Sequence, residues 1–215
     1  PPLPPLSVLN LGKILKKNNI PVELIDFQLL VANKTIEFNE GFYKEAVKLI
    51  DSKQAEVLGF TAMCSNYPLA LNLAGKCKRS HQKYKIIFGG PQATATAEET
   101  LKTFPFIDII VHGEGEITLI EVMNKLDKGE SLAGVAGISY RDGEKIIHNE
   151  KRELIKDLDD LPMLDYGLAP PLSEYQGEQK NYTGIIEVGR GCPYNCTYCS
   201  TTLHWGRRFR LKSAA

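Results

Sequence analysis

The sequence predicts an α/β fold in which helices cover both faces of a parallel sheet. Short strand-like apolar segments recur along residues 1–128, and amphipathic segments of helical spacing separate them. This alternation is typical of a doubly wound parallel sheet. After residue 128 the pattern changes to a hairpin, a long connector and a cysteine-rich loop. We therefore expect a sheet domain at 1–150, a linker at 151–182 and the start of a second domain at 183–215.

Each element is predicted from its own pattern of apolar side chains. Side chains three or four residues apart line one face of a helix, and this spacing predicts helices at 6–17, 42–50, 69–79, 97–103 and 118–128. Alternating or short continuous apolar runs predict strands at 22–26, 56–61, 85–88, 107–111 and 184–188. Residues 138–148 are expected to form a hairpin around the turn at 141–144.

The connector at 151–182 is acidic and contains proline, but we expect it to be ordered. Its apolar side chains can pin it to the sheet domain; they are Leu158, Leu161, Met163, Leu164 and Tyr166. The strand at 184–188 would then open the next domain, with the cysteine loop directly at its carboxyl end. Active sites of parallel barrels gather at that end of the strands.

Composition excludes several functional classes. The formal net charge of the 215 residues is zero, which gives no electrostatic reason to expect a nucleic-acid partner. The basic run at 207–212 is the local exception, and a solvated helix start or an anion-binding strip explains it equally well. No apolar stretch reaches the roughly 20 residues that span a membrane. A cluster of free thiols requires a reducing compartment, which predicts a cytoplasmic protein.

The most specific motif is a group of three cysteines spaced C-x3-C-x2-C, formed by Cys192, Cys196 and Cys199. Three thiolates on one loop can hold three irons of a [4Fe–4S] cluster and leave the fourth iron open. A zinc site with His204 as the fourth ligand is the alternative, although zinc motifs usually contain C-x2-C pairs. A disulfide framework is disfavoured, because the chain has five cysteines and the other two are far away in sequence.

Three predicted strand-end loops carry weaker signals, at 61–64, 89–94 and 112–116. Ligands of doubly wound sheets bind at the carboxyl ends of the strands. The pair Gly89 and Gly90 permits close approach of a bulky ligand to the backbone. A tight turn explains a glycine pair equally well, and a helix-capping loop explains residues 113–115.

The segment Gly191-Cys192-Pro193-Tyr194-Asn195-Cys196-Thr197-Tyr198-Cys199-Ser200 resembles the cluster loop of radical S-adenosylmethionine enzymes. The resemblance implies that the three cysteines ligate a [4Fe–4S] cluster and that its open iron binds S-adenosylmethionine. It also implies that Tyr198 lies against the adenine, and that cleavage of S-adenosylmethionine gives a 5′-deoxyadenosyl radical. The cofactors supply this chemistry and the protein positions them.

Residues 1–128 resemble the Rossmann-like cobalamin-binding domain, so the whole chain is similar to cobalamin-dependent radical S-adenosylmethionine enzymes. The resemblance implies cobalamin contacts at Thr61, Met63, Gly89, Gly90, Gly113 and Glu114. The chain departs from the family pattern at Pro4, which stands where many cobalamin domains carry the histidine that coordinates cobalt from below. His81 and His148 are interpreted as surface residues, while His112 could border the pocket. A cobalamin bound without a histidine ligand, with its nucleotide tail out, is therefore expected.

The resemblance implies methyl transfer to an unactivated carbon of a small molecule or peptide, with an electron donor such as flavodoxin or ferredoxin. Ring formation by the same cofactors is an alternative. Two further alternatives are a methylthiotransferase-like enzyme whose sheet domain binds no cobalamin, and a non-enzymatic cobalamin-binding module with a zinc knuckle. Because Pro1–Pro5 is not preceded by a strand and the chain closes soon after Cys199, we expect a fragment that is inactive by itself.

Overall fold

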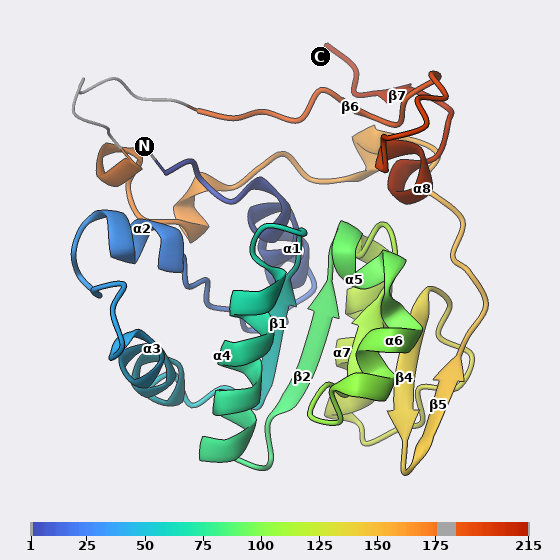
Figure 1. Ribbon diagram of the computed structural model, residues 1–215. Helices are drawn as coiled ribbons and strands as arrows, with labels where there is room; N and C mark the ends of the chain where they lie inside the picture. The colour runs from blue at the N-terminus through green and yellow to red at the C-terminus, as the bar shows by residue number, and fades with distance from the viewer. Residues whose placement is uncertain (1, 176–183, 215) are drawn as a thin grey trace.

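The computed structural model describes residues 2–175 and 184–214, and its main feature is a five-stranded sheet of order β1-β2-β3-β4-β5 (Figure 1). The strands are β1 (Val57–Thr61), β2 (Lys85–Gly89), β3 (Ile109–Val111), β4 (Ile138–Asp142) and β5 (Lys145–His148). β1, β2 and β3 run parallel, whereas the hairpin β4–β5 continues the sheet in antiparallel orientation. The predicted α/β fold and hairpin are confirmed, and the hairpin makes the sheet mixed.

Helices cover both faces of this sheet. The helices are α1 (Leu6–Lys17), α2 (Phe27–Ala32), α3 (Phe42–Asp51), α4 (Tyr67–Ser80), α5 (Pro91–Ala95), α6 (Ala97–Thr103), α7 (Glu116–Asp127) and α8 (Thr201–Trp205), of which α8 lies beyond the end of the sheet and not on a face. Each of the five predicted helices is found, with its ends within two residues of the expected positions. Figure 1 shows α4 and α6 on the near face of the sheet and α7 behind it.

The core consists of two layers because neighbouring residues of each central strand point to opposite faces. Ile86, Phe88 and Ile110 pack with residues of α3, α4 and α6 on one face. Ile87 and Ile109 pack with residues of α7 and the hairpin on the other. These strands are short and apolar on both faces, as expected for buried parallel strands.

Two strand predictions are wrong, at 22–26 and 184–188. In the described part of the chain neither segment forms a strand of a sheet, although the Val188 carbonyl accepts the Lys212 N–H at 2.9 Å; alternation alone does not provide a ladder of hydrogen-bonding partners. Asp26 instead caps α2, accepting a hydrogen bond from the Leu29 N–H at 3.1 Å. The backbone of Ile185 is bound by the Tyr166 hydroxyl.

The connector is packed against the sheet domain where the structure describes it. Leu158 is fully buried, and Asp165 forms a 3.1 Å ion pair with Lys13 of α1. Short 3-10 helices lie at Leu158–Asp160, Tyr166–Leu168 and Leu172–Tyr175. Met163 is 76% exposed, so the prediction that it pins the connector is wrong. Residues 176–182 of the predicted linker lie outside the described residues.

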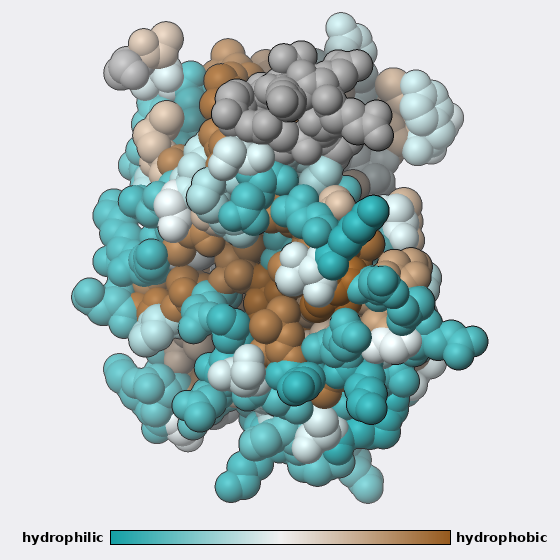
Figure 2. Space-filling model, turned by 90° about the vertical axis from the view of Figure 1, so that its left-hand side faces the viewer, coloured by the Kyte–Doolittle hydropathy of each residue, from teal (hydrophilic) through white to brown (hydrophobic). Residues whose placement is uncertain are grey.

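The surface is mixed in polarity. Figure 2 looks onto the side where α2 and α3 lie and shows hydrophobic side chains in the middle of this face, framed by hydrophilic ones. Among the helices that the structure describes, none has the length and apolar character needed to cross a membrane.

Candidate cofactor-binding site

The loops that follow β1 and β2 meet at the carboxyl edge of the sheet. Thr61 and Gly89 are register partners at the ends of these strands, and the Ala62 N–H donates to the Gly89 carbonyl at 2.8 Å. Met63 follows with its side chain 57% exposed. Its backbone N–H donates to Asn66 Oδ1 at 2.8 Å, which fixes the loop. The structure thus brings together four of the predicted cobalamin contacts, Thr61, Met63, Gly89 and Gly90.

Gly90 has a structural role at this edge. Its backbone angles are φ 96° and ψ 175°, a conformation that is essentially restricted to glycine. A Cβ atom at this position would lie 2.8 Å from the Ala62 carbonyl oxygen and 3.0 Å from the Ala62 nitrogen. The glycine therefore lets the loops after β1 and β2 approach each other, whatever its relation to a ligand.

The loop after β3 carries Gly113 and joins the same edge. Its N–H donates to Thr94 Oγ1 at 3.1 Å. The preceding residue, His112, is hydrogen-bonded to the hairpin, with 2.7 Å between its Nε2 and Ser139 Oγ. Burial and the nearby His148 lower the pKa of His112, so the ring is neutral near pH 7. His81 and His148 are exposed, as predicted.

Glu114 is buried, and its carboxylate accepts hydrogen bonds from the Ile155 N–H and from the side chains of Arg190 and Arg210. Burial alone would raise the pKa of the carboxyl, but these hydrogen bonds outweigh burial and hold the pKa below its usual range. Its predicted contact with cobalamin stays a prediction. The structure adds a contact that sequence reasoning missed, between the sheet domain and the cysteine segment.

The cysteine segment lies above the carboxyl edge of the sheet (Figure 1). Its stem is a two-stranded antiparallel ladder of β6 (Gly189–Arg190) and β7 (Arg210–Leu211). Gly191 allows the turn into the loop, because a Cβ there would overlap the Arg208 carbonyl oxygen. Arg210, within the predicted basic run, is buried and ion-paired rather than solvated.

The three cysteines of the loop are free thiols; Cys192 is half-buried, and Cys196 and Cys199 are exposed. Hydrogen bonding of Cys199 with the side chain and the backbone of Thr201 lowers the pKa of the Cys199 thiol, which favours the thiolate that binds metal. Three thiols on one accessible loop are a donor set that fits three irons of a cluster. Among the described residues no three His, Cys, Asp or Glu side chains are already gathered closely enough to hold a metal ion. The three metal ligands thus stay a prediction.

Two further residues of this segment bear on the predictions. Tyr198, predicted to lie against the adenine, is 90% exposed and free to contact a ligand. His204, the alternative zinc ligand, lies in α8, where its Nδ1 is buried without a hydrogen-bond partner in the described part of the chain. Burial lowers the pKa of its ring.

Sequence reasoning missed the arginines that hold the loop, Arg190 and Arg210. The available signal was their position, since each lies within a short strand that flanks the cysteines. Arg190 stands two residues before Cys192. Arginine suits a buried ion pair because its planar group binds carboxylates through two parallel hydrogen bonds.

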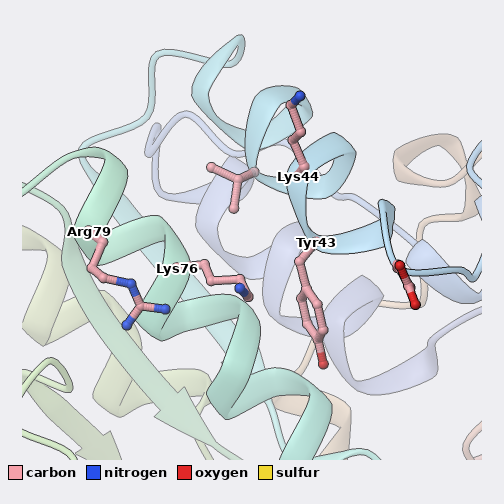
Figure 3. A pocket seen from close by; sticks show the side chains of 6 residues that line it. Tyr43, Lys44, Lys76 and Arg79 are labelled. Atoms are coloured by element: carbon pink, nitrogen blue, oxygen red, sulfur yellow. The ribbon is translucent and has the colours of Figure 1, made fainter.

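A pocket of about 300 Å³ lies elsewhere, between α3 and α4 (Figure 3). Lys76 of α4 points over the ring of Tyr43 of α3, with 5.3 Å from its Nζ to the ring centroid. The residues that line the pocket are Glu40, Tyr43, Lys44, Val47, Lys76 and Arg79. None of the predicted site residues is among them.

The fold is that of a doubly wound domain whose loops gather at the carboxyl end of its parallel strands, which is where such sheets bind ligands. Residues 1–123 match the family model described as the B12 binding domain. The chain therefore belongs to the B12-binding domain family. The resemblance to cobalamin-dependent radical S-adenosylmethionine enzymes is confirmed.

Three comparisons illustrate this relationship. An uncharacterized methyltransferase of Pyrococcus horikoshii is 32% identical over 96% of this chain and 42% of the relative. The anaerobic magnesium-protoporphyrin IX monomethyl ester cyclase of Synechocystis is 30% identical over 95% of this chain and 39% of the relative. The cobalamin-dependent S-adenosylmethionine radical enzyme OxsB, solved with aqua-cobalamin and S-adenosylmethionine, has the same fold. Its TM-score is 0.77 at 24% identity, covering 99% of this chain and 28% of OxsB. The chain thus spans about two fifths of the length of these curated relatives.

Proposed function

We propose that this chain is part of a cobalamin-dependent radical S-adenosylmethionine enzyme that transfers a methyl group to an unactivated carbon. The observation that carries the proposal is the position of the cysteine loop. Arg190 and Arg210, which flank the loop, are ion-paired to Glu114, and Glu114 belongs to the loop after β3 of the B12-binding sheet. Two sets of candidate cofactor residues therefore lie at the same edge of one fold.

One set of residues would bind the iron–sulfur cluster with S-adenosylmethionine, and another would bind cobalamin. Cys192, Cys196 and Cys199 would hold a [4Fe–4S] cluster, and Tyr198 is available to lie against the adenine of S-adenosylmethionine. Thr61, Met63, Gly89, Gly90 and Gly113 would form the floor for cobalamin. When bound, these cofactors would supply a 5′-deoxyadenosyl radical and a transferable methyl group. The protein would orient both toward one substrate carbon.

Further requirements follow from this assignment. The cluster needs one-electron reduction, so a donor such as flavodoxin or ferredoxin is part of the proposal. Its exposed thiols need a reducing compartment, which favours the cytoplasm. The substrate is a small molecule or peptide.

Ring formation is the second candidate reaction, because the Synechocystis relative is a cyclase at 30% identity. A methylthiotransferase-like enzyme is disfavoured by the cysteines of the sheet domain. Cys77 is fully buried within α4 and Cys64 is exposed in a loop, so this pair offers no second cluster site. Product analysis with the whole enzyme and isotopically labelled methyl donor would separate methyl transfer from ring formation.

The cluster assignment is tested by anaerobic reconstitution with iron and sulfide. We expect about four irons per chain and brown absorption in the wild type. Cys196→Ala should lose both, while Cys64→Ala, which removes an exposed cysteine outside the loop, should keep both. Retention of iron and sulfide by Cys196→Ala would contradict the assignment. Binding of one zinc without brown absorption would favour the zinc knuckle.

A further inference from the structure

Five charged side chains, four of them buried and Glu187 half-buried, form a cluster between the sheet and the cysteine segment. Glu114 and Glu116 come from the loop after β3 and the start of α7; Glu187, Arg190 and Arg210 come from the cysteine segment. Arg190 and Arg210 are only 4% and 6% exposed. Buried charges are costly unless they are paired and hydrogen-bonded, so the geometry of this cluster is closely constrained.

Glu114 occupies the centre of the cluster. Its Oε1 lies 3.1 Å from Arg190 Nη1 and 2.9 Å from Arg210 Nη2. Its Oε2 lies 3.0 Å from Arg210 Nη1 and accepts the Ile155 N–H at 2.7 Å. Arg190 and Arg210 are direct register partners in the β6–β7 ladder. One carboxylate of the sheet domain therefore binds both strands of the stem from which the cysteine loop projects.

The two arginines depend on Glu114 to different degrees. Arg190 also pairs with Glu116 at 2.6 Å and with Glu187 at 2.9 Å. Among the residues that the structure describes, Glu114 is the carboxylate paired with Arg210. Removing the charge of Glu114 therefore leaves Arg210 buried without a counter-ion, while Arg190 keeps two. The stem should loosen first at β7 and α8, because Arg210 also donates to the Trp205 carbonyl at 3.2 Å.

The neighbouring backbone reinforces this arrangement. A Cβ at Gly113, the residue before Glu114, would lie 3.7 Å from the His204 carbonyl oxygen in α8. The loop after β3 thus touches the helix that follows the cysteines and also holds the stem of their loop. A shift of this loop would move the cysteine segment relative to the edge of the sheet.

We propose that Glu114 is a positioning residue that sets the cysteine loop over the carboxyl edge of the sheet. This inference rests on the proposed function, because it gives Glu114 the role of fixing the separation between the iron–sulfur and cobalamin sites. Glu114 acts through Arg190 and Arg210, not by contact with reacting atoms.

The test uses Trp205, the single tryptophan of the chain, as a reporter of docking. In the full chain without cofactors, Glu114→Gln should shift Trp205 emission to the red and at least double its quenching by acrylamide. The far-UV circular dichroism should stay that of the folded sheet domain. Glu98→Gln removes a carboxylate from an exposed pair with Lys102 and should leave the emission unchanged. Unchanged Trp205 quenching in Glu114→Gln would overturn the proposal.

A double variant separates positioning from a general loss of packing. If Glu114 acts through Arg210, Glu114→Gln combined with Arg210→Gln should increase quenching no further than the larger single effect. Additive effects would contradict the coupling. Should Glu114→Gln fail to fold, Arg210→Lys should produce the same emission shift, since lysine lacks the two-pronged geometry. An unshifted Arg210→Lys would then overturn the proposal.

A second readout distinguishes failure of this inference from failure of the proposed function. After reconstitution, iron should be lost to a chelator several-fold faster from Glu114→Gln than from Glu98→Gln. A wild type that takes up no iron would refute the proposed cluster and leave the fluorescence test standing. A wild type that retains iron no better than Glu114→Gln would refute the positioning role alone.

Discussion

Replacing Gly90 by alanine tests why a glycine pair ends β2. The sequence suggested that the pair leaves room for a ligand, whereas the structure shows Gly90 against the backbone of Ala62. An added Cβ would lie 2.8 Å from the Ala62 carbonyl oxygen, and that atom belongs to the main chain. The contact is also tied by two hydrogen bonds, from Ala62 N–H to Gly89 O at 2.8 Å and from Gln92 N–H to Ala62 O at 3.1 Å. Relief of the overlap therefore requires the two loops to separate.

The expected loss of stability has two parts. The backbone angles of Gly90, φ 96° and ψ 175°, cost a non-glycine residue about 1–3 kcal/mol. Overpacking against a main chain that cannot yield adds about 1–3 kcal/mol. Together the two ranges give about 2–6 kcal/mol, and we take about 3 kcal/mol, in the lower half of that range, as the expected total. The domain should still fold, because typical stabilities are about 5–15 kcal/mol.

The assay is urea unfolding of the chain without cofactors, followed by far-UV circular dichroism. With a slope of about 2 kcal/mol per molar urea, the midpoint of Gly90→Ala should fall by about 1.5 M. Gly129 has a positive φ of 64° but open space around it, so Gly129→Ala should cost only about 1 kcal/mol. Gly59 has neither constraint, and Gly59→Ala should change little. A Gly90→Ala midpoint no lower than that of Gly129→Ala would refute the argument that the backbone of Ala62 requires a glycine at this position.

Three further predictions concern the core, a thiol and pH. Phe88 is fully buried, and its ring stacks on that of Phe60 with 5.1 Å between centroids, so Phe88→Ala should lower the free energy of unfolding in urea by about 3–5 kcal/mol. Phe38 is 66% exposed, so Phe38→Ala should lower it little. Equal effects of the two substitutions would contradict the assigned core. Burial raises the pKa of Cys77 to about 12, so mass spectrometry should find Cys77 unmodified by iodoacetamide at pH 8 until urea unfolds the chain. The exposed Cys64 should react in the folded protein. Labelling of Cys77 before the chain unfolds would contradict its burial. The pKa of Glu114 in the folded chain lies below its ordinary value of 4.5, so the contribution of Glu114 to docking is complete above pH 4.5 and is lost as the pH falls through the depressed pKa. Trp205 emission should therefore shift to the red only below pH 4.5. A shift between pH 5 and 7 would contradict the assignment of the docking to the ionised Glu114.

The sheet could be predicted from sequence because its signals are local. Ile86, Ile87 and Phe88 form a short apolar run that is buried on both faces, and the helices between strands carry clear periodicity. The prediction failed where a segment becomes a strand only if a neighbouring strand is available to pair with it. Residues 22–26 alternate like a strand, yet alternation cannot supply a partner, and Asp26 serves as a helix cap instead.

The candidate site could be predicted only in part, for a similar reason. The cysteines stand together in sequence, so their spacing carries the prediction. Glu114 is separated from Arg190 by 76 residues, and the two meet only because the connector returns the chain to the edge of the sheet. Nothing local distinguishes a glutamate that binds a ligand from one that binds two arginines of its own chain. Likewise, the basic run at 207–212 is explained equally well from sequence as a solvated helix start or an anion-binding strip, and neither interpretation predicts the buried ion pair of Arg210 with Glu114.

The most direct test of the central claim, that one chain holds both cofactors at one edge, is joint anaerobic reconstitution. The chain would be incubated with iron, sulfide and hydroxocobalamin, desalted, and measured by ultraviolet–visible spectroscopy and metal analysis. We predict about four irons and one cobalamin retained per chain. Retention of iron without cobalamin would contradict the claim for the sheet edge, and retention of cobalamin without iron would contradict it for the cysteine loop.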